Sequence, residues 1–305
     1  MNNTGTFLSI IVPTFNYGHM LRRSLESVLS QMTGECELVV VDDGSTDNTS
    51  ELLVELSADY PVGFHWIRQD NAGAAAARNR GLCASYGRHI LFLDADDELL
   101  PGALDAICST FHDDLDATVV IGGRITRWPN GREKHHKPPL SLDVNPCRRV
   151  ADYLLHKKIS VSHGAVAVRR SLIERRTYPE SFRSREDIPV SAYWLAYGNI
   201  KTISSQLVLI HKHPDSLRHR GKVSEPIELE LAEEIFLGLP KECQGLKRAF
   251  LAQRYLSLSR ISAASGEVST ARRFLIMACR LDCAQLLVQG QLRKLLSSWL
   301  GMLFR

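Results

Sequence analysis

Short apolar runs alternate with helical patterns along the first 105 residues. The apolar runs lie at 9–12, 37–41, 64–67 and 89–93, and each is followed by a cluster of polar, proline or glycine residues. Leucine and valine recur at helical spacing within 21–29, and further helical segments follow at 49–56 and 74–82. Runs of this length predict strands, and strands that alternate with helices predict a parallel, doubly wound α/β sheet.

Carboxylates follow two of the predicted strands directly. Asp42 and Asp43 come after 37–41, and Asp94, Asp96 and Asp97 come after 89–93. Acidic groups at the end of a buried strand are costly unless a positive charge compensates them, and ligands bind beyond the carboxyl ends of such strands. Because Asp oxygens suit Mg²⁺ or Mn²⁺ that also bind phosphates, this pattern predicts a metal-bridged diphosphate site. The alternative is that the second cluster starts a helix over 98–111.

Four motifs occur in a fixed order along this part of the chain. They are Ser-Ile-Ile-Val-Pro-Thr-Phe-Asn at 9–16, Val-Val-Val-Asp-Asp-Gly-Ser-Thr-Asp at 39–47, Asn-Ala-Gly-Ala-Ala-Ala-Ala-Arg-Asn at 71–79 and Leu-Asp-Ala-Asp-Asp at 93–97. Together they resemble the inverting family 2 glycosyltransferases of bacterial cell-surface polysaccharide synthesis, strongly over 8–105 and more weakly to 220. The resemblance implies an α/β fold of GT-A type, a Rossmann-like, mixed and mostly parallel sheet flanked by helices.

The resemblance assigns donor-binding roles to five residues. Pro13, Phe15 and Asp43 match positions that hold the nucleotide base, where a carboxylate accepts the ring N–H of uracil or thymine. This implies a nucleotide-sugar donor of the UDP- or dTDP-sugar type. Arg78 matches a residue that faces the diphosphate, for which a guanidinium is well suited. Asp94 matches the residue near the donor ribose or sugar.

The resemblance also implies a divalent metal, Mg²⁺ or Mn²⁺. Asp96 matches the metal ligand of the Asp-x-Asp motif, whereas Asp97 is expected to cap the next helix. His213 is expected to bind the metal or a phosphate, and imidazole favours Mn²⁺ over Mg²⁺. Lys212, Arg218 and Arg220 are expected to add positive charge near the leaving group. A polar surface loop is the alternative for this segment.

A catalytic base is expected further along the chain, because inversion requires a carboxylate beside the acceptor hydroxyl. The family takes this base from a Glu-Asp pair before a helix, and here Glu186 and Asp187 precede a predicted helix at 190–197. Asp187 is the predicted base, and Glu186 is expected to orient the acceptor or Asp187. The alternative is that Asp187 only caps the helix, since Pro189 follows it.

Composition is consistent with a cytoplasmic enzyme. The 305 residues carry a formal net charge of +3, and no aromatic residues interleave with the basic ones, so nucleic acid is not an expected partner. Seven scattered cysteines without a Cys-x-x-Cys pair predict neither a disulfide framework nor structural zinc, and Cys279 and Cys283 are expected in a helix core. No signal peptide or bilayer-spanning run is expected.

Basic residues gather between Gly122 and Arg149, around a hairpin turn predicted at 129–131. In the family this region lies on the acceptor side, so the charge suits an anionic, lipid-linked saccharide acceptor. A solvated hairpin is the alternative.

The composition changes near residue 225. We therefore predict a catalytic domain at 1–224, with a nucleotide-binding half at 1–105 and an acceptor half at 106–224, and a helical extension at 225–305. Helices are expected at 226–239, 246–264 and 268–281, followed by a last amphipathic helix whose apolar face includes Leu292, Leu295 and Trp299. Peripheral contact with the inner face of the cytoplasmic membrane explains that face, and packing on protein explains it equally well.

The resemblance thus predicts an inverting, metal-dependent glycosyltransferase. It would move a hexose or L-rhamnose from a UDP- or dTDP-sugar to a saccharide hydroxyl in lipopolysaccharide or another surface polysaccharide, and a lipopolysaccharide rhamnosyltransferase is one specific case. A nucleotidyltransferase is an alternative, although such enzymes have a basic, Gly-rich loop where this chain has 13–16. A catalytically inactive GT-A-like scaffold or binding module is the other alternative, against which the intact acidic residues argue.

Overall fold

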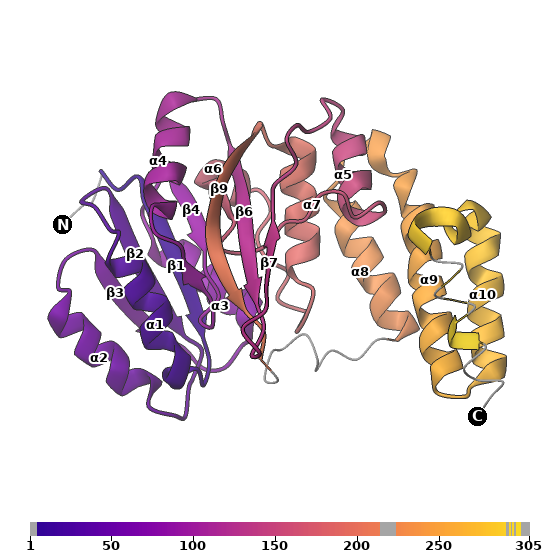
Figure 1. Ribbon diagram of the computed structural model, residues 1–305, viewed down its shortest axis with the longest axis horizontal. Coiled ribbons are helices and arrows are strands. Elements are labelled where there is room, and N and C mark those ends of the chain that lie inside the picture. The colour runs from indigo at the N-terminus through magenta and orange to yellow at the C-terminus, as the bar shows by residue number, and fades with distance from the viewer. Residues whose placement is uncertain (1–4, 214–223, 291–292, 294, 296, 300–305) are drawn as a thin grey trace. The chain divides into compact units, whose positions relative to one another are not determined.

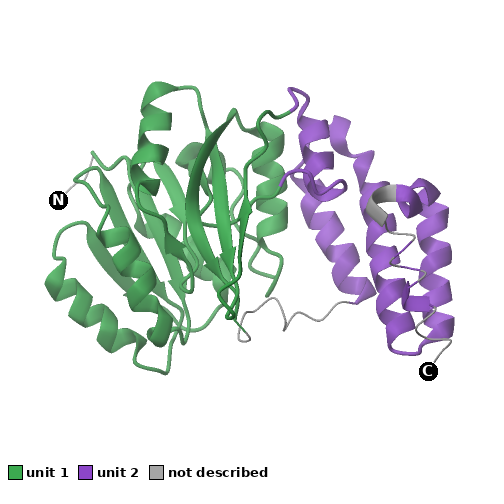
Figure 2. Cartoon of the chain, viewed as in Figure 1, with its two compact units in different colours: residues 1–142, 160–220 green, residues 143–159, 221–305 purple. Residues whose placement is uncertain are grey.

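The computed structural model describes residues 5–213, 224–290, 293, 295 and 297–299 (Figure 1). The chain divides into two units (Figure 2). The first, called the sheet unit, comprises 1–142 and 160–220, and the second, called the helical unit, comprises 143–159 and 221–305. The predicted domain boundary at 224 stays a prediction.

A mixed sheet forms the core of the sheet unit, with the strand order β3-β2-β1-β4-β8-β6-β9-β5. Its first four strands are mutually parallel, as predicted: β1 (Leu8–Thr14), β2 (Cys36–Asp42), β3 (Phe64–Arg68) and β4 (His89–Phe92). Every residue of β1, β2 and β4 is buried. Continuous apolar runs therefore mark strands that are covered on both faces.

The other strands make the sheet mixed. They are β5 (Glu98–Leu99), β6 (Val119–Arg127), β7 (Glu133–His136), β8 (Val166–Arg169) and β9 (Ile200–His211). β8 runs antiparallel to β4 and β6, whereas the long strands β6 and β9 lie side by side in parallel (Figure 1). β7 pairs with β6 through a turn that includes Gly131 at φ 80°, which confirms the predicted hairpin.

The helices that cover this sheet are α1 (Gly18–Leu29), α2 (Thr49–Asp59), α3 (Ala74–Ala84), α4 (Ala103–Asp113), α6 (Arg170–Ile173) and α7 (Asp187–Tyr197). Of these, α1, α2, α3 and α7 lie where the sequence predicts helices. The apolar face of α1 is buried at Leu21, Leu25 and Val28. α3 packs closely on β1, since a Cβ added at Gly81 would lie 2.3 Å from the Ile11 side chain. Small residues in α3 therefore bring Arg78 near the strand ends.

One predicted helix start is wrong. The segment after Asp97 is the short strand β5, which pairs with β9, and α4 begins only at Ala103, after Gly102 at φ 79°. Asp97 therefore caps no helix. Its buried carboxylate instead accepts a hydrogen bond from the His211 N–H at 3.1 Å. A pairing partner more than 100 residues away overrides the local helical pattern.

The helical unit contains the three helices predicted for the C-terminal part. Its elements are α5 (Pro146–Leu154), α8 (Glu225–Leu237), α9 (Leu246–Ala264), α10 (Val268–Asp282) and the 3-10 segments η2 (Lys241–Cys243) and η3 (Cys283–Gly290). α9 and α10 pack together through an apolar cluster that includes Tyr255, Leu256 and Phe274. Most of the predicted last helix lies outside the described residues. Among the described residues, no helix is long and apolar enough to cross a bilayer.

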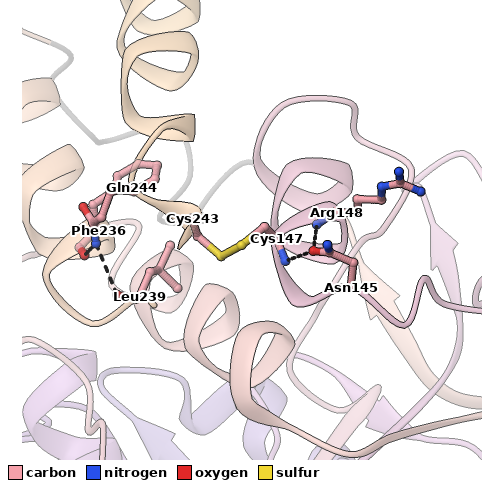
Figure 3. Close-up of a disulfide and its surroundings, with 7 residues drawn as sticks. All are labelled: Asn145, Cys147, Arg148, Phe236, Leu239, Cys243 and Gln244. Carbon is pink, nitrogen blue, oxygen red and sulfur yellow. Dashed lines mark hydrogen bonds between the residues drawn. A yellow bond between two sulfur atoms is a disulfide. The ribbon is translucent and has the colours of Figure 1, made fainter. Parts of the chain in front are cut away.

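The expectation for the cysteines is wrong in two respects. Cys147 and Cys243 form a disulfide within the helical unit, with Cα atoms 5.1 Å apart (Figure 3). Each half-cystine is held by a local hydrogen bond: the Cys147 N–H donates to the Asn145 side chain at 2.9 Å, and the Cys243 N–H donates to the Pro240 carbonyl at 2.9 Å. Cys279 and Cys283, expected in a core, are exposed. Spacing along the chain does not reveal which cysteines meet in space.

Removal of this disulfide should destabilise the protein. Replacing both Cys147 and Cys243 with Ser should lower the free energy of unfolding by about 4 kcal/mol, because a bond that closes a loop of roughly 100 residues restricts the unfolded chain. Chemical denaturation with and without reductant measures this difference, and Cys83→Ser, which removes an exposed free thiol, is the control. Identical denaturation midpoints for the double variant and the oxidised protein would contradict the prediction.

Candidate functional site

The candidate site lies at the carboxyl ends of β1, β2 and β4. Because these strands are parallel neighbours, the polar residues that follow them meet at one edge of the sheet. The loops after β1 and β2 are joined directly: the Asn16 side chain accepts from the Thr46 N–H at 2.7 Å, and the Asn16 N–H donates to Ser45 Oγ at 2.9 Å. Asn16 adopts the left-handed conformation, at φ 58°, which Asn tolerates better than most residues.

Asp43 organises the loop that follows β3. Its Oδ1 accepts hydrogen bonds from the Gln69 side chain and the Ala72 N–H, and its Oδ2 accepts one from the Gly73 N–H, each at 2.8 Å. A carboxylate offers about four acceptor positions, so roughly one remains for a ligand. The role of Asp43 in base binding stays a prediction. Nearby, Pro13 is buried and Phe15 is 42% exposed, so the Phe15 ring is accessible for stacking.

Arg78 links two acidic segments that lie far apart in the sequence. From α3, its Nη2 donates to Asp94 Oδ1 at 2.8 Å and its Nη1 donates to Glu186 Oε1 at 2.7 Å. The guanidinium is almost fully buried, and burial alone would lower its pKa, but the carboxylates of Asp94 and Glu186 raise it above the ordinary value. The three side chains form one cluster, in which a single guanidinium pairs with two carboxylates. The predicted contact of Arg78 with a diphosphate stays a prediction.

His163 belongs to the same cluster and has no sequence signal of its own. Its Nδ1 lies 3.3 Å from Asp94 Oδ1, and its Nε2 lies 3.0 Å from the Tyr178 hydroxyl. Although burial alone would raise the pKa of Asp94, His163 and Arg78 hold it well below its usual range. Asp94 therefore stays ionised. Sequence reasoning missed His163 because it is a single polar residue before β8, outside the four motifs.

Asp187 is the first residue of α7, next to the Glu186 that pairs with Arg78. It lies in the first turn, while Glu186 occupies the N-cap position, and an acidic side chain there stabilises the start of the helix. The role of Asp187 as the base stays a prediction. Burial raises the pKa of Tyr178 well above its ordinary value, and although the Arg78 charge opposes this, the negative charge of Asp187 adds to it. Asp187 thus lies within electrostatic reach of the Arg78 cluster.

Asp96 and His213 form the second half of the site. Asp96 Oδ2 lies 2.7 Å from His213 Nε2, so the two predicted metal ligands are neighbours. Burial, together with the negative charges of Asp96 and Asp94, raises the pKa of the adjacent Asp97 well above its usual value. Arg218 and Arg220, expected beside the leaving group, lie outside the described residues.

The donor set suits a divalent ion that also binds substrate. Within 5–213 and 224–290, no group of three His, Cys, Asp or Glu side chains is placed to hold a metal by itself. A carboxylate and an imidazole nitrogen are already adjacent, however, and Mg²⁺ or Mn²⁺ commonly takes its remaining ligands from phosphate and water. His213 Nδ1 is buried and has no hydrogen-bond partner among the described residues. Asp96 and His213 therefore fit a substrate-bridged ion.

Comparison with known proteins identifies related sequences over part of the chain. A glucosyltransferase of Campylobacter jejuni, named GalNAc(5)-diNAcBac-PP-undecaprenol beta-1,3-glucosyltransferase, is 30% identical over 180 residues, 59% of this chain and 57% of the relative. The uncharacterized glycosyltransferase YibD of Escherichia coli is 38% identical over 117 residues, 38% of this chain and 34% of the relative. The chain thus matches between one third and three fifths of the length of these two relatives.

A solved structure matches almost the whole chain. Staphylococcus aureus TarS 1-349 in complex with UDP-GlcNAc superposes with a TM-score of 0.66 at 24% identity, covering 97% of this chain and 90% of TarS 1-349. This likeness confirms the predicted α/β fold with a C-terminal helical region. The sequence model described as "Glycosyl transferase family 2" matches residues 9–177, more than half of the 305 residues. The chain therefore belongs to glycosyl transferase family 2.

Proposed function

We propose that the protein is an inverting, metal-dependent glycosyltransferase that moves a sugar from a UDP- or dTDP-sugar to a saccharide hydroxyl. The observation that carries this proposal is the pair of ion pairs made by Arg78, to Asp94 and to Glu186. They join the end of β4, where the donor residues gather, to the start of α7, where the predicted base lies. Family membership and the UDP-GlcNAc complex of the TarS structure support the choice of donor class.

The donor would lie across the carboxyl ends of the parallel strands. Phe15 supplies an exposed ring for stacking on the base, and Asp43 supplies the acceptor position that its protein partners leave free. Asp94, kept ionised by His163 and Arg78, accepts hydrogen bonds from the ribose or sugar hydroxyls. Asp43 and Asp94 are held by contacts within the protein, so this part of the site is formed before the donor arrives.

Asp96 and His213 would hold the metal. When bound, Mg²⁺ or Mn²⁺ supplies positive charge against the diphosphate that leaves with the nucleotide. Asp187 then acts on the acceptor: its carboxylate takes the proton from the attacking hydroxyl, which approaches the sugar from the face opposite the diphosphate. Glu186 is held by its ion pair with Arg78, so in this proposal it orients the acceptor or Asp187, and Asp187 acts as the base.

The acceptor in this proposal is a saccharide of a bacterial surface polysaccharide, including a lipid-linked one. The name of the Campylobacter relative includes an undecaprenol-linked saccharide, which supports this class. The β6–β7 hairpin presents Arg124, Arg127, Arg132 and Lys134. Glu133 neutralises Arg127, and Arg132 lies over the Trp128 ring at 4.4 Å, so only part of this charge is available to an anionic acceptor.

A donor panel tests the proposal. Thermal stabilisation in the presence of Mn²⁺ is measured for UDP-, dTDP- and GDP-sugars, including UDP-GlcNAc, UDP-glucose and dTDP-L-rhamnose. We expect stabilisation by UDP- or dTDP-sugars and slow hydrolysis of the best donor, with inversion at the anomeric carbon detected by NMR. Binding without hydrolysis or transfer would indicate an inactive module, and pyrophosphate release would indicate a nucleotidyltransferase. Stabilisation by GDP-sugars alone would contradict the role of Asp43.

Replacement of Asp96 tests the metal site separately. Asp96→Ala should weaken Mn²⁺-dependent donor binding at least tenfold, about 1.4 kcal/mol, because one of the two protein ligands is lost. Calorimetry with and without Mn²⁺ measures the effect, and Asp113→Asn, at an exposed position on α4, is the control. A donor affinity that is equal in the variant and the wild type would remove Asp96 from the metal site.

A further inference from the structure

The outward face of α10 has an unusual composition. Val268, Arg272, Ile276 and Arg280 follow one another at intervals of four residues, so they form one ridge along the helix. Val268 is 50% exposed and Ile276 is 42% exposed. Together with the neighbouring row they line a groove of about 660 Å³, formed by Val268, Ser269, Arg272, Arg273, Ile276, Met277 and Arg280. Apolar and basic side chains thus alternate on an exposed surface, here called the α10 face.

The positive charge of the α10 face is largely uncompensated. Arg273 pairs with Glu225 at 2.9 Å, but Arg272 and Arg280 make no ion pair with any residue that the structure describes. Two helical intervals of four residues place their Cα atoms roughly 12 Å apart. Between 246 and 290 there are seven Lys and Arg residues and only two acidic residues, whereas α8 carries five Glu residues. Along the chain, the basic residues of the helical unit are therefore concentrated in α9 and α10, and the acidic ones in α8.

This alternation suits an anionic lipid surface better than a protein partner. Each exposed apolar residue of the α10 face has an Arg one helical turn away, and a specific protein partner would have to place an acidic group opposite each of these Arg residues. At the surface of a bilayer the phosphate layer lies directly above the acyl chains. Arg side chains can therefore pair with phosphates while the aliphatic side chains enter the apolar layer beneath them.

We propose that the α10 face docks on an anionic phospholipid bilayer. Arg272 and Arg280 pair with lipid phosphates, and Val268 and Ile276 enter the boundary between headgroups and acyl chains. These residues differ from those of the predicted last helix, for which membrane contact stays a prediction. The inference concerns a separate surface and does not depend on the proposed transferase reaction, because lipid binding is measured without a donor or an acceptor.

Vesicle flotation with the full chain tests the proposal. We expect binding to vesicles of phosphatidylcholine with 30% phosphatidylglycerol at about 0.05 M salt, little binding to pure phosphatidylcholine, and release at about 0.5 M salt. The double variant Arg272→Gln with Arg280→Gln should bind about 30-fold more weakly, because each basic residue near such a surface contributes roughly fivefold. Ile276→Ser should weaken binding without changing its dependence on salt.

A control variant tests whether the position of the lost charge matters, and denaturation midpoints exclude unfolding as the cause of weaker binding. Lys158→Gln with Lys241→Gln removes the same charge outside the α10 face and should bind as the wild type does, and denaturation midpoints confirm that every variant is folded. Equal binding to both vesicle types, unchanged binding of the double Arg variant or no binding at all would overturn the proposal. Concentration-dependent dimerisation that the double Arg variant abolishes would assign the α10 face to a second copy instead, and would also overturn it.

Discussion

Asp187→Asn should abolish sugar transfer and leave donor binding intact. The amide has nearly the size of the carboxylate but accepts no proton, so the acceptor hydroxyl stays a poor nucleophile. General-base catalysis contributes about 10²–10⁴-fold, and we expect a fall in kcat of at least about 10³-fold. Because Asp187 lies at the start of α7 and Glu186 makes the ion pair with Arg78, the local structure should persist. Steady-state kinetics measures kcat, and calorimetry measures the affinity for the donor.

Two comparisons make the Asp187 result specific. Asp187→Glu keeps a base but displaces it, so it should retain more activity than the Asn variant. Glu186→Gln should instead reduce the stability of the fold, because it leaves the Arg78 guanidinium with one carboxylate fewer. Near-normal turnover by Asp187→Asn would show that another group removes the proton. If the donor panel has already shown transfer, this result rejects only the base assignment and leaves the proposed function in place.

Arg78→Met should cost both stability and activity. The substitution keeps an apolar stem of similar length but leaves Asp94 and Glu186 without their shared cation. Breaking a buried ion pair from one side costs about 3–5 kcal/mol, and we expect about 2–3 kcal/mol because the Asp94 side chain is partly exposed to solvent. Donor affinity should also fall, since Asp94 is then held by His163 alone. Chemical denaturation and calorimetry measure the two effects.

Two further variants on α3 show whether the effect of Arg78→Met comes from the ion pairs of Arg78 or from the loss of any positive charge. Arg80→Met removes an exposed Arg two residues away on α3 and should change the unfolding free energy by less than about 0.5 kcal/mol. Arg78→Lys keeps the charge but has no planar fork, so it should maintain one of the two ion pairs and give an intermediate stability. Equal stabilities of Arg78→Met and the wild type would show that the cluster contributes nothing to the fold.

The elements of this protein are largely predictable, but the partners of its side chains are not. The helix at 246–264 matches the prediction exactly, and the four N-terminal strands differ by only a few residues at their ends. The predicted start of the helix at 98–111 is wrong, because Glu98 and Leu99 pair with β9 and the helix begins at Ala103. The periodicity of a short segment contains no information about a strand more than 100 residues away. Only the tertiary structure therefore shows that residues 98 and 99 belong to a strand and not to the helix.

The same distinction divides the candidate site. The position of the acidic residues after 89–93 could be predicted from the local sequence alone, because an apolar run shows where a buried strand ends. Ligands bind at such strand ends. The approach of Arg78 to Glu186, of His163 to Asp94 and of Cys147 to Cys243 could not, since each depends on the path of the chain between them. Hydrophobic spacing and turn chemistry act over a few residues, and they set the strands, the helices and the acidic strand ends. Packing of the complete sheet and of the helical unit then brings remote side chains into contact, and this decides which charges are neutralised and which cysteines bond.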